Sequence, residues 1–237
     1  MLILAIDTCD ARGSVAVLRD EALLAVVRPD SAQDYSAWLL PAVDRVLAAA
    51  KANLQDVDLF AVAAGPGSFT GLRVGLTSVK AWAEVYRRPI APVSRLEALG
   101  LQAVAVSSFV APFVDARRAQ IFAGLYRRND GRIERVSEEV VLSAADFLDS
   151  VEKDSGGGRV AWVSLDPNCL TREPGWAGRV TRGESVQAVE PVLAPAIGRI
   201  ALLRAKSNQL VDALTLDANY VRRSDAEIFW KGAAHGK

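Results

Sequence analysis

The stretch LFAVAAGPGSFTGLRVG, Leu59 to Gly75, decides how the first half of this chain folds. Residues 59–64 are uniformly apolar, which is typical of a short strand buried on both faces of a sheet. The glycine-rich segment Gly65 to Gly75 follows directly, and a helical pattern continues from it to about Tyr86. A buried strand, a glycine turn and a helix in succession predict an α/β fold.

The glycine-rich turn lacks the spacing of a phosphate-binding loop. Backbone amides at the start of a helix bind phosphate, so the position itself is suitable. A P-loop needs a Lys followed by Ser or Thr after its last glycine, but Leu72-Arg73 follows Gly71 here. The dinucleotide pattern GxGxxG is also absent, because three residues separate Gly67 from Gly71. The turn alone is therefore a weak signal for nucleotide binding.

A second interpretation of this segment is close helix packing. Gly67, Gly71, Gly75 and Ser78 follow one another at steps of four, four and three, which places them on one helix face. Each glycine costs a helix about 1 kcal/mol relative to alanine, so such a face indicates the approach of another backbone. Packing on the chain's own sheet or first helix and packing on a partner helix explain the face equally well.

The flanking segments complete the first half of the chain. Short apolar runs separated by polar breaks predict an antiparallel meander. Apolar residues then recur at steps of three and four, which predicts an amphipathic helix with Trp38 and Leu39 in its first turns. The expected elements are strands over 2–8, 14–18 and 22–27, a helix over 36–50, a strand over 90–94 and a helix from Leu96.

A similar order returns in the second half. Strands are expected over 109–118, 120–128, 132–142 and 160–165, a short helix opens at Ser143, and the last strong helix begins at Pro195. The repetition predicts two similar α/β lobes. We expect the lobes to comprise residues 1–105 and 106–213, and a tail, 214–237, to pack back toward the first lobe.

Composition limits the possible classes of function. Of 237 residues, 51% are apolar, and 28 Lys and Arg balance 28 Asp and Glu, so no overall positive charge holds nucleic acid. The opening residues are typical of a strand rather than a signal peptide, and no apolar run approaches the roughly 18 residues of a membrane span. Cys9 and Cys169 lie far apart, as expected of free thiols. We expect a soluble, cytoplasmic protein.

The single histidine, His235, lies in the polar C-terminal tail. Nucleophilic triads need a positioned imidazole, and zinc sites usually use His or several Cys, so neither chemistry is expected. Asp7 and Thr8 end the first strand, and Asp115 ends the equivalent strand of the second half. Such aspartates can hold a metal opposite a nucleotide phosphate, but without companion carboxylates we interpret all three residues as structural or vestigial.

Four motifs in this order resemble the TsaB family, also called YeaZ: IDT at residues 6–8, GPGSFTGLRVG at 65–75, DARR at 115–118 and YVRR at 220–223. The resemblance covers almost the whole chain. It implies the actin-like ATPase fold (ASKHA, ribonuclease H-like) with two lobes, related to the catalytic subunit TsaD but without its metal-binding histidine motif. It also implies a non-catalytic subunit, with no cofactor, metal or catalytic residue of its own.

The resemblance further implies a function and partners. The family supports formation of N6-threonylcarbamoyladenosine beside the anticodon of tRNAs reading ANN codons, by pairing with TsaD, with the ATPase TsaE as a further partner and tRNA reached through the complex. Pairing, and a possible homodimer, would use the two helices of the first lobe. The residues this assigns to the interface are Trp38, Leu39, Gly67, Gly71, Arg73, Gly75, Ser78 and Trp82.

One departure and two rival functions accompany the resemblance. Many family members have His-Ser-Glu where this chain has Tyr35-Ser36-Ala37. This difference points to altered contacts with a partner at the start of the first helix. An ATPase of the sugar-kinase type would need two phosphate-binding turns and an adenosine pocket, and only the first hairpin partly fits. A peptidase, as an older label for the group suggests, would need a nucleophile or metal set that the sequence does not contain.

Overall fold

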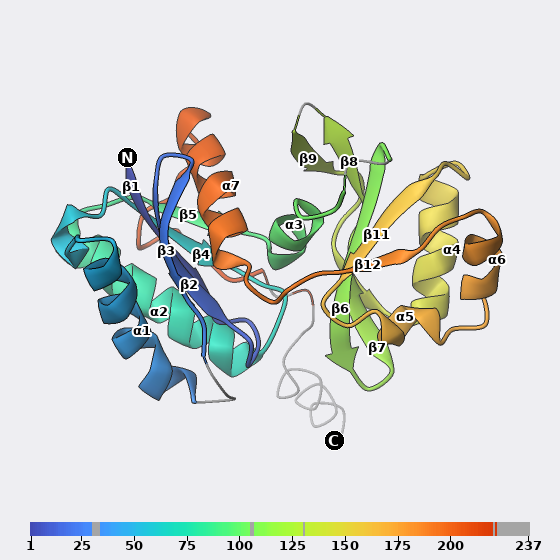
Figure 1. The fold of residues 1–237 in the computed structure, drawn as a ribbon, viewed down its shortest axis with the longest axis horizontal. Coiled ribbons are helices and arrows are strands. Elements are labelled where there is room, and N and C mark those ends of the chain that lie inside the picture. Colours follow the sequence, from blue (N-terminus) through green and yellow to red (C-terminus); the bar gives the residue numbers. More distant parts are fainter. Residues whose placement is uncertain (30–33, 105–106, 130, 220, 222–237) are drawn as a thin grey trace, which may run out of the picture.

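The computed structural model describes residues 1–29, 34–104, 107–129, 131–219 and 221, and it consists of two α/β lobes side by side (Figure 1). The sheet of the first lobe has the strand order β3-β2-β1-β4-β5. β1 pairs antiparallel with β2 and parallel with β4. These strands are β1 (Leu2–Asp7), β2 (Ser14–Arg19), β3 (Ala22–Val27), β4 (Leu59–Ala63) and β5 (Ile90–Val93), so the expected meander and buried strand are confirmed.

Helices cover both faces of the first sheet. α1 (Tyr35–Ala49) and α2 (Phe69–Tyr86) lie on one face, and their apolar stripes pack with those of β1, β2 and β4. The short 3-10 helix η1 (Leu54–Asp56) leads into β4, and α3 (Arg95–Gly100) follows β5. α3 lies between the lobes in Figure 1 and packs on the second sheet. It is therefore part of the interface between the two lobes, called the seam below.

The second lobe repeats the order of the first. Its sheet runs β10-β7-β6-β11-β12, with β8 and β9 added beside β6, and the central strands again pair antiparallel on one side and parallel on the other. This duplicated order is the actin-like fold that the resemblance predicts. The strands are β6 (Phe109–Arg117), β7 (Gln120–Ala123), β8 (Tyr126–Asn129), β9 (Arg132–Arg135), β10 (Val140–Leu142), β11 (Val160–Ser164) and β12 (Val186–Ala188).

An aromatic core joins the second sheet to its helices. Trp162 of β11 makes edge-on contacts with Phe147, at a ring-centroid distance of 5.8 Å, and with Trp176, at 5.4 Å. The helices of this layer are α4 (Ala144–Asp154), α5 (Asn168–Thr171) and α6 (Trp176–Thr181). The sequence does not predict α5, α6 or β12, because each is too short to show a repeat of apolar residues.

The last helix corrects the expected lobe boundary. α7 (Ala194–Lys206) lies in the expected second lobe, 106–213, but packs on β1, β2, β4 and β5 of the first sheet. The apolar face of α7 is buried against this sheet. Gly198 leaves room for the side chain of Leu18, and a Cβ added at residue 198 would overlap that side chain. Further along, Val211 bridges to Ile90, and Leu216 is buried in the core beneath α1 and α2. Residues 222–237 of the expected tail lie outside the described residues.

In the part of the chain that the structure describes, no helix combines the length and the apolar character that crossing a membrane requires.

Candidate functional site

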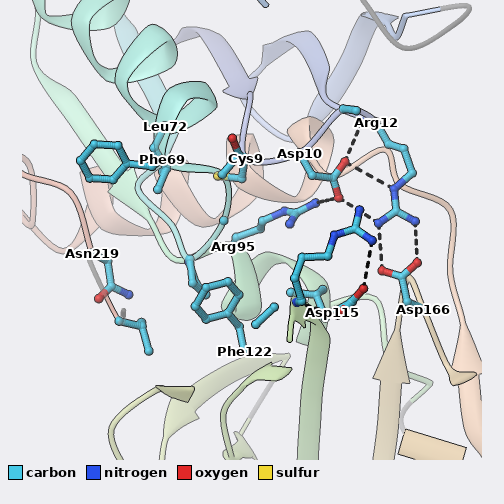
Figure 2. Close-up of a pocket in the computed structure, with 18 of the residues that line it drawn as sticks. Cys9, Asp10, Arg12, Phe69, Leu72, Arg95, Asp115, Phe122, Asp166 and Asn219 are labelled. Carbon is cyan, nitrogen blue, oxygen red and sulfur yellow. Dashed lines mark hydrogen bonds and ion pairs between the residues drawn. The ribbon is translucent and has the colours of Figure 1, made fainter. Parts of the chain in front are cut away.

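A cavity of about 970 Å³ lies between the lobes. Figure 2 shows its walls: the turn after β1, the start of α2 and the start of α3 on the first lobe, and the β6–β7 hairpin and the end of β11 on the second. One side is apolar, with Phe69, Leu72 and Phe122, and the opposite side carries arginine and aspartate side chains. A large cleft with convergent polar groups is where a ligand site is expected in such a protein.

The end of β1 lies beneath the floor of this cleft. Asp7 is 1% exposed; its Oδ1 accepts the backbone N–H of Cys9 at 2.9 Å, and its Oδ2 lies 3.5 Å from Nε of Arg95. Thr8, also 1% exposed, donates its hydroxyl to the carbonyl oxygen of Gly71 at 2.7 Å. Both residues therefore have fixed intramolecular partners.

Arg95 supplies the positive charge for two aspartates at once. Its side chain is 3% exposed, and its Nη2 donates to Oδ2 of Asp10. Burial alone would raise the pKa of Asp10, but the charge of Arg95 and the hydrogen bonds from Arg12 and Arg95 lower it well below its usual value. Burial alone would likewise lower the pKa of Arg95, and Asp7 and Asp10 raise it instead. Each charge in this group therefore has a partner of opposite sign close by.

Arg12 carries this network across the cleft. It donates to both carboxylate oxygens of Asp166, which follows β11 of the second lobe, at 2.9 Å each. Its Nη2 also lies 2.9 Å from Oδ2 of Asp10 in its own lobe. Figure 2 shows Arg12 between the two aspartates. A planar guanidinium matches two carboxylates in this way, so the pairing joins the lobes through well-oriented hydrogen bonds.

Asp115 does not join Asp7. It lines the cleft on the β6–β7 hairpin, where it accepts the backbone N–H of Arg117 at 2.7 Å and lies 3.3 Å from that side chain. Among the described residues no three His, Cys, Asp or Glu side chains are placed to share a metal ion. The paired strand-end aspartates suggested by the sequence thus have separate arginine partners.

The glycine face of α2 packs inside the chain. Ser68 caps the helix by accepting the N–H of Gly71 at 3.3 Å. A Cβ added at Gly67 would overlap Cys9, and one at Gly71 or Gly75 would overlap Thr8. Of the two explanations left open by the sequence, internal packing accounts for these glycines. Their placement on an exposed partner surface is therefore corrected, because the end of β1 fills the space in front of them.

The other residues assigned to an interface have mixed positions. Trp38 and Leu39 are 3% and 1% exposed and belong to the first-lobe core, so they contribute no surface. Trp82 is half-buried with its ring 6.0 Å from that of Phe60, and Ser78 is half-buried beside it on α2. Arg73 is exposed, and its guanidinium lies 3.8 Å above the ring of Phe69.

Several exposed or buried residues of interest are missed by sequence reasoning. Leu40 belongs to the apolar repeat that predicts the first helix, so the sequence predicts it to be buried, but it is 55% exposed on α1. Val85 is 72% exposed on α2. Asp10, Arg12 and Asp166 lie in polar breaks that predict turns, and Arg95 lies at a helix start. A polar turn directly after a buried strand is a usable signal for these residues, but it does not show which residue each one contacts.

A second buried carboxylate lies at the seam. Glu139 is 8% exposed and accepts hydrogen bonds from Ser94, Tyr126 and Asn219, the last at 2.6 Å. Burial and the adjacent Glu139 charge raise the pKa of Tyr126 well above its usual value. Asn219 also donates its backbone N–H to Ala64 at 2.7 Å, so the C-terminal segment is fixed to both lobes.

Comparisons with known proteins agree with this architecture. Residues 26–161 match the sequence family described as TsaD, tRNA N6-adenosine threonylcarbamoyltransferase. The protein named tRNA threonylcarbamoyladenosine biosynthesis protein TsaB from Bacillus subtilis (strain 168) is 36% identical over 155 residues, 65% of this chain and 68% of that protein. Its namesake from Haemophilus influenzae (strain ATCC 51907 / DSM 11121 / KW20 / Rd) is 24% identical over 98% of this chain and 96% of its own length.

A solved structure extends the likeness to the fold. YeaZ from Pseudomonas aeruginosa superposes with a TM-score of 0.70 at 26% identity, covering 92% of this chain and 99% of that one. The motifs, the duplicated lobe topology and the similarity to named relatives thus agree. The chain belongs to the TsaB (YeaZ) family, whose members are named for tRNA threonylcarbamoyladenosine biosynthesis.

Proposed function

We propose that this protein acts in tRNA threonylcarbamoyladenosine biosynthesis as a non-catalytic subunit that binds and activates a TsaD-type catalytic subunit. The product is N6-threonylcarbamoyladenosine beside the anticodon of tRNAs that read ANN codons. A TsaE-type ATPase is a further partner, and tRNA is bound through the complex in the cytoplasm. The names of the relatives and the match to the TsaD family support the pathway and the partner.

The observation that carries the non-catalytic role is the ion pair between Arg95 and Asp7. A metal-dependent phosphoryl transfer in this cleft needs ionised carboxylates free to bind a divalent cation. Asp7 instead faces a buried guanidinium, Asp10 shares that guanidinium, and Asp166 is held by Arg12. A cation would have to displace the buried Arg95 from Asp7 and Asp10, and that guanidinium would then lose its counter-charges.

Exposed parts of α1 and α2 support the partner-binding role. The two helices lie together on one face of the first sheet and present Leu40 and Val85 to solvent, at 55% and 72% exposure. Phe69, 38% exposed, adds an aromatic ring at the start of α2. Large exposed apolar side chains on adjacent helices are typical anchors for a helical interface.

Complex formation tests the partner. The chain and the TsaD-type protein of the same organism are mixed and analysed by size-exclusion chromatography with light scattering. Wild type should form a one-to-one complex, and Leu40→Asp and Val85→Asp should weaken it. Val180→Asp is the matched control, since Val180 is 55% exposed on the second lobe. A change at Gly75 is unsuitable, because its space is filled by Thr8.

Activity tests the non-catalytic role separately. Threonylcarbamoylation of tRNA is measured with the TsaD-type and TsaE-type proteins, with and without this chain. We expect the chain to stimulate the reaction, Asp115→Asn to stimulate it equally, and the chain alone to hydrolyse no ATP. ATP hydrolysis by the isolated chain that Asp115→Asn abolishes would contradict the proposal and favour an active kinase-type ATPase.

A further inference from the structure

The last described residues of the chain lie in the wall of the cleft between the lobes. After α7, Val211 bridges to Ile90 of β5. The backbone N–H of Asn219 then donates to the carbonyl oxygen of Ala64, which directly follows β4, at 2.7 Å. Asn219 and Val221 both line the cleft. Residues 222–237, here called the terminal segment, therefore continue the chain from a wall of this cleft.

The point from which the terminal segment starts is fixed by both lobes. The side-chain amide of Asn219 donates to the buried carboxylate of Glu139 in the second lobe at 2.6 Å, while its backbone is bonded to the first lobe. Figure 2 shows Asn219 on the same side of the cleft as Phe69 and Phe122. The terminal segment thus starts beside the apolar wall.

This apolar wall offers surface that further apolar side chains can cover. Phe69 is 38% exposed, and Leu72 and Phe122 lie in the same wall. The cleft has a volume of about 970 Å³, which is within the range of pockets that enclose a ligand. Each Å² of apolar surface removed from water contributes about 25 cal/mol, so covering the wall is favourable.

The terminal segment contains side chains suited to this wall. Its large apolar residues are Ile228, Phe229 and Trp230, and the rest of the segment is small or polar. Aromatic side chains bury large areas and often anchor interfaces. Ile228 is seven residues beyond Val221, and seven extended residues span up to about 23 Å. The three apolar residues can therefore reach the wall.

Charges beside these apolar residues match one rim of the cleft. Asp225 and Glu227 directly precede Ile228 by three residues and one residue. Arg117 and Arg118 line the cleft on the β6–β7 hairpin. Arg117 is 87% exposed, and exposed ion pairs such as its 3.3 Å contact with an aspartate are weak and exchange readily. The two carboxylates would find positive charge within reach once the apolar residues are in the cleft.

We propose that the terminal segment docks in the cleft of its own chain. Residues 228–230 lie on the apolar wall that contains Phe69, Leu72 and Phe122, and the acidic residues before them face the β6–β7 hairpin. Because the segment is tethered at Val221, its effective concentration at the cleft is on the order of millimolar. Contacts too weak to hold a free peptide are therefore sufficient to keep the cleft occupied.

Two other occupants fit the cleft less well. The same segment of a second copy lacks the tether, so at micromolar protein it is disfavoured about a thousandfold. A nucleotide would bring its phosphates close to Asp10, Asp115 and Asp166, and the arginines that could bind phosphate are paired with these carboxylates. The inference goes beyond the proposed function, since it concerns this chain alone and its test contains no partner.

Paramagnetic relaxation enhancement in the full chain tests the docking. A nitroxide is attached at Ala233→Cys in a chain with Cys169→Ser, and Cys9 is fully buried. The amide signals of Phe69 and Phe122 should broaden strongly. The amide of Val180, which lies in α6 of the second lobe, is the internal reference and should keep its line width.

Variants of the terminal segment identify the anchoring side chains. Replacing residues 228–230 by serine should reduce the broadening at the cleft at least about fivefold, because the apolar area that drives docking is removed. Ala226→Ser with Ala234→Ser is the matched control, since it changes the same segment without touching the anchors, and it should behave as wild type. Unfolding of the chain does not complicate these variants, because all of them lie outside the described core.

A mixed sample separates docking within one chain from docking between chains. ¹⁵N-labelled chain without nitroxide is mixed with unlabelled chain that carries it, and the cleft signals should then stay sharp. Broadening in this sample as strong as within one chain would assign the segment to a second copy and overturn the proposal. Even, weak broadening over the whole surface would also overturn it, as would broadening that the serine variant leaves unchanged.

Added ADP with magnesium tests the remaining occupant. The cleft signals of wild type should not shift, because the terminal segment covers the wall. Shifts of the Phe69 and Phe122 amides that are equally large in wild type and in the serine variant would show a cleft open to a nucleotide. That result would contradict the docking, while complex formation with a TsaD-type protein would remain a separate question.

Discussion

Nε of Arg95 lies 3.5 Å from Oδ2 of Asp7, and the two side chains are 3% and 1% exposed. The aspartate ends the first strand of one lobe and the arginine opens the helix at the seam, so one buried pair connects the sheet to the cleft. A buried ion pair contributes little net stability compared with apolar packing. Removing one partner, however, leaves the other as an unpaired buried charge, which has a large free-energy cost. Among the side chains of the cleft, we therefore expect the loss of Arg95 to lower the free energy of unfolding most.

Arg95→Met should lower the free energy of unfolding by about 3–5 kcal/mol, because Asp7 then carries an uncompensated buried charge. Adding Asp7→Asn should recover part of the loss, since a neutral amide needs no counter-charge. Urea unfolding followed by tryptophan fluorescence measures both. Arg182→Met, which removes an exposed pair with Glu152, is the control and should leave the midpoint unchanged. Equal stability of Arg95→Met and wild type would disprove the role assigned to the pair.

Asp10 should make stability depend on acidity. Burial alone would raise the pKa of Asp10, but Arg95 and Arg12 hold it well below its value in the unfolded chain, which is about 4. Its stabilising effect is therefore complete above about pH 4 and is lost as the pH falls toward the folded-state pKa. Asp10→Asn should have a lower urea midpoint at pH 7 and a shallower decline toward pH 3. The exposed Asp149→Asn should follow wild type; parallel profiles for Asp10→Asn and wild type would refute the linkage.

Gly71→Ala should destabilise the first lobe by about 1–3 kcal/mol, because the new methyl group overlaps the backbone of Thr8 and forces the helix or the strand end to move. Gly178→Ala is the matched control in helix α6, where an added Cβ meets nothing within 4 Å. That change should be neutral or stabilise by up to about 1 kcal/mol through helix propensity. Thermal unfolding distinguishes them; similar melting temperatures for the two variants would show that α2 tolerates a side chain at this contact.

Both cysteines should react slowly with a thiol reagent in the native state. Cys9 is fully buried, and burial, reinforced by the charge of Asp7, raises its pKa well above the usual value. Burial and then the charges of Asp166 and Asp115 raise the pKa of Cys169 to about 12. The thiolate is the reactive form, so at pH 8 each should react at least about tenfold slower than in urea. Fast native reaction, assigned with Cys9→Ser and Cys169→Ser, would contradict these surroundings.

Local sequence patterns predict the long elements because each repeats its own period. The apolar stripe of α1, the glycine turn before α2 and the apolar strands of the meander lie close to the predicted ranges. The short elements α5, α6 and β12 show no complete period and are missed. The position of α7 is missed for another reason: its amphipathic stripe predicts a helix but not which of two sheets it covers.

The candidate site was predictable only in part. The sequence points to Asp7, Thr8 and Asp115 as strand-end residues and to an unusual glycine face on α2. It gives no indication that Arg95 contacts both Asp7 and Asp10, because Arg95 lies 85 positions or more from each of them in the chain. Nor does it distinguish a glycine face turned to a partner from one turned to Thr8, since both require the same small residues.

The sequence by itself determined the α/β class, the duplicated lobes and the family, because these depend on periodicity and on motifs that are local in the chain. Tertiary structure decided which charges meet and which surfaces remain open. Arg12 joins Asp166 across the cleft, Gly75 packs on Thr8, and Leu40 and the β3 edge remain exposed. Ion pairing and close packing act over a few ångströms in space. They therefore depend on how the lobes fold together, which no local pattern contains.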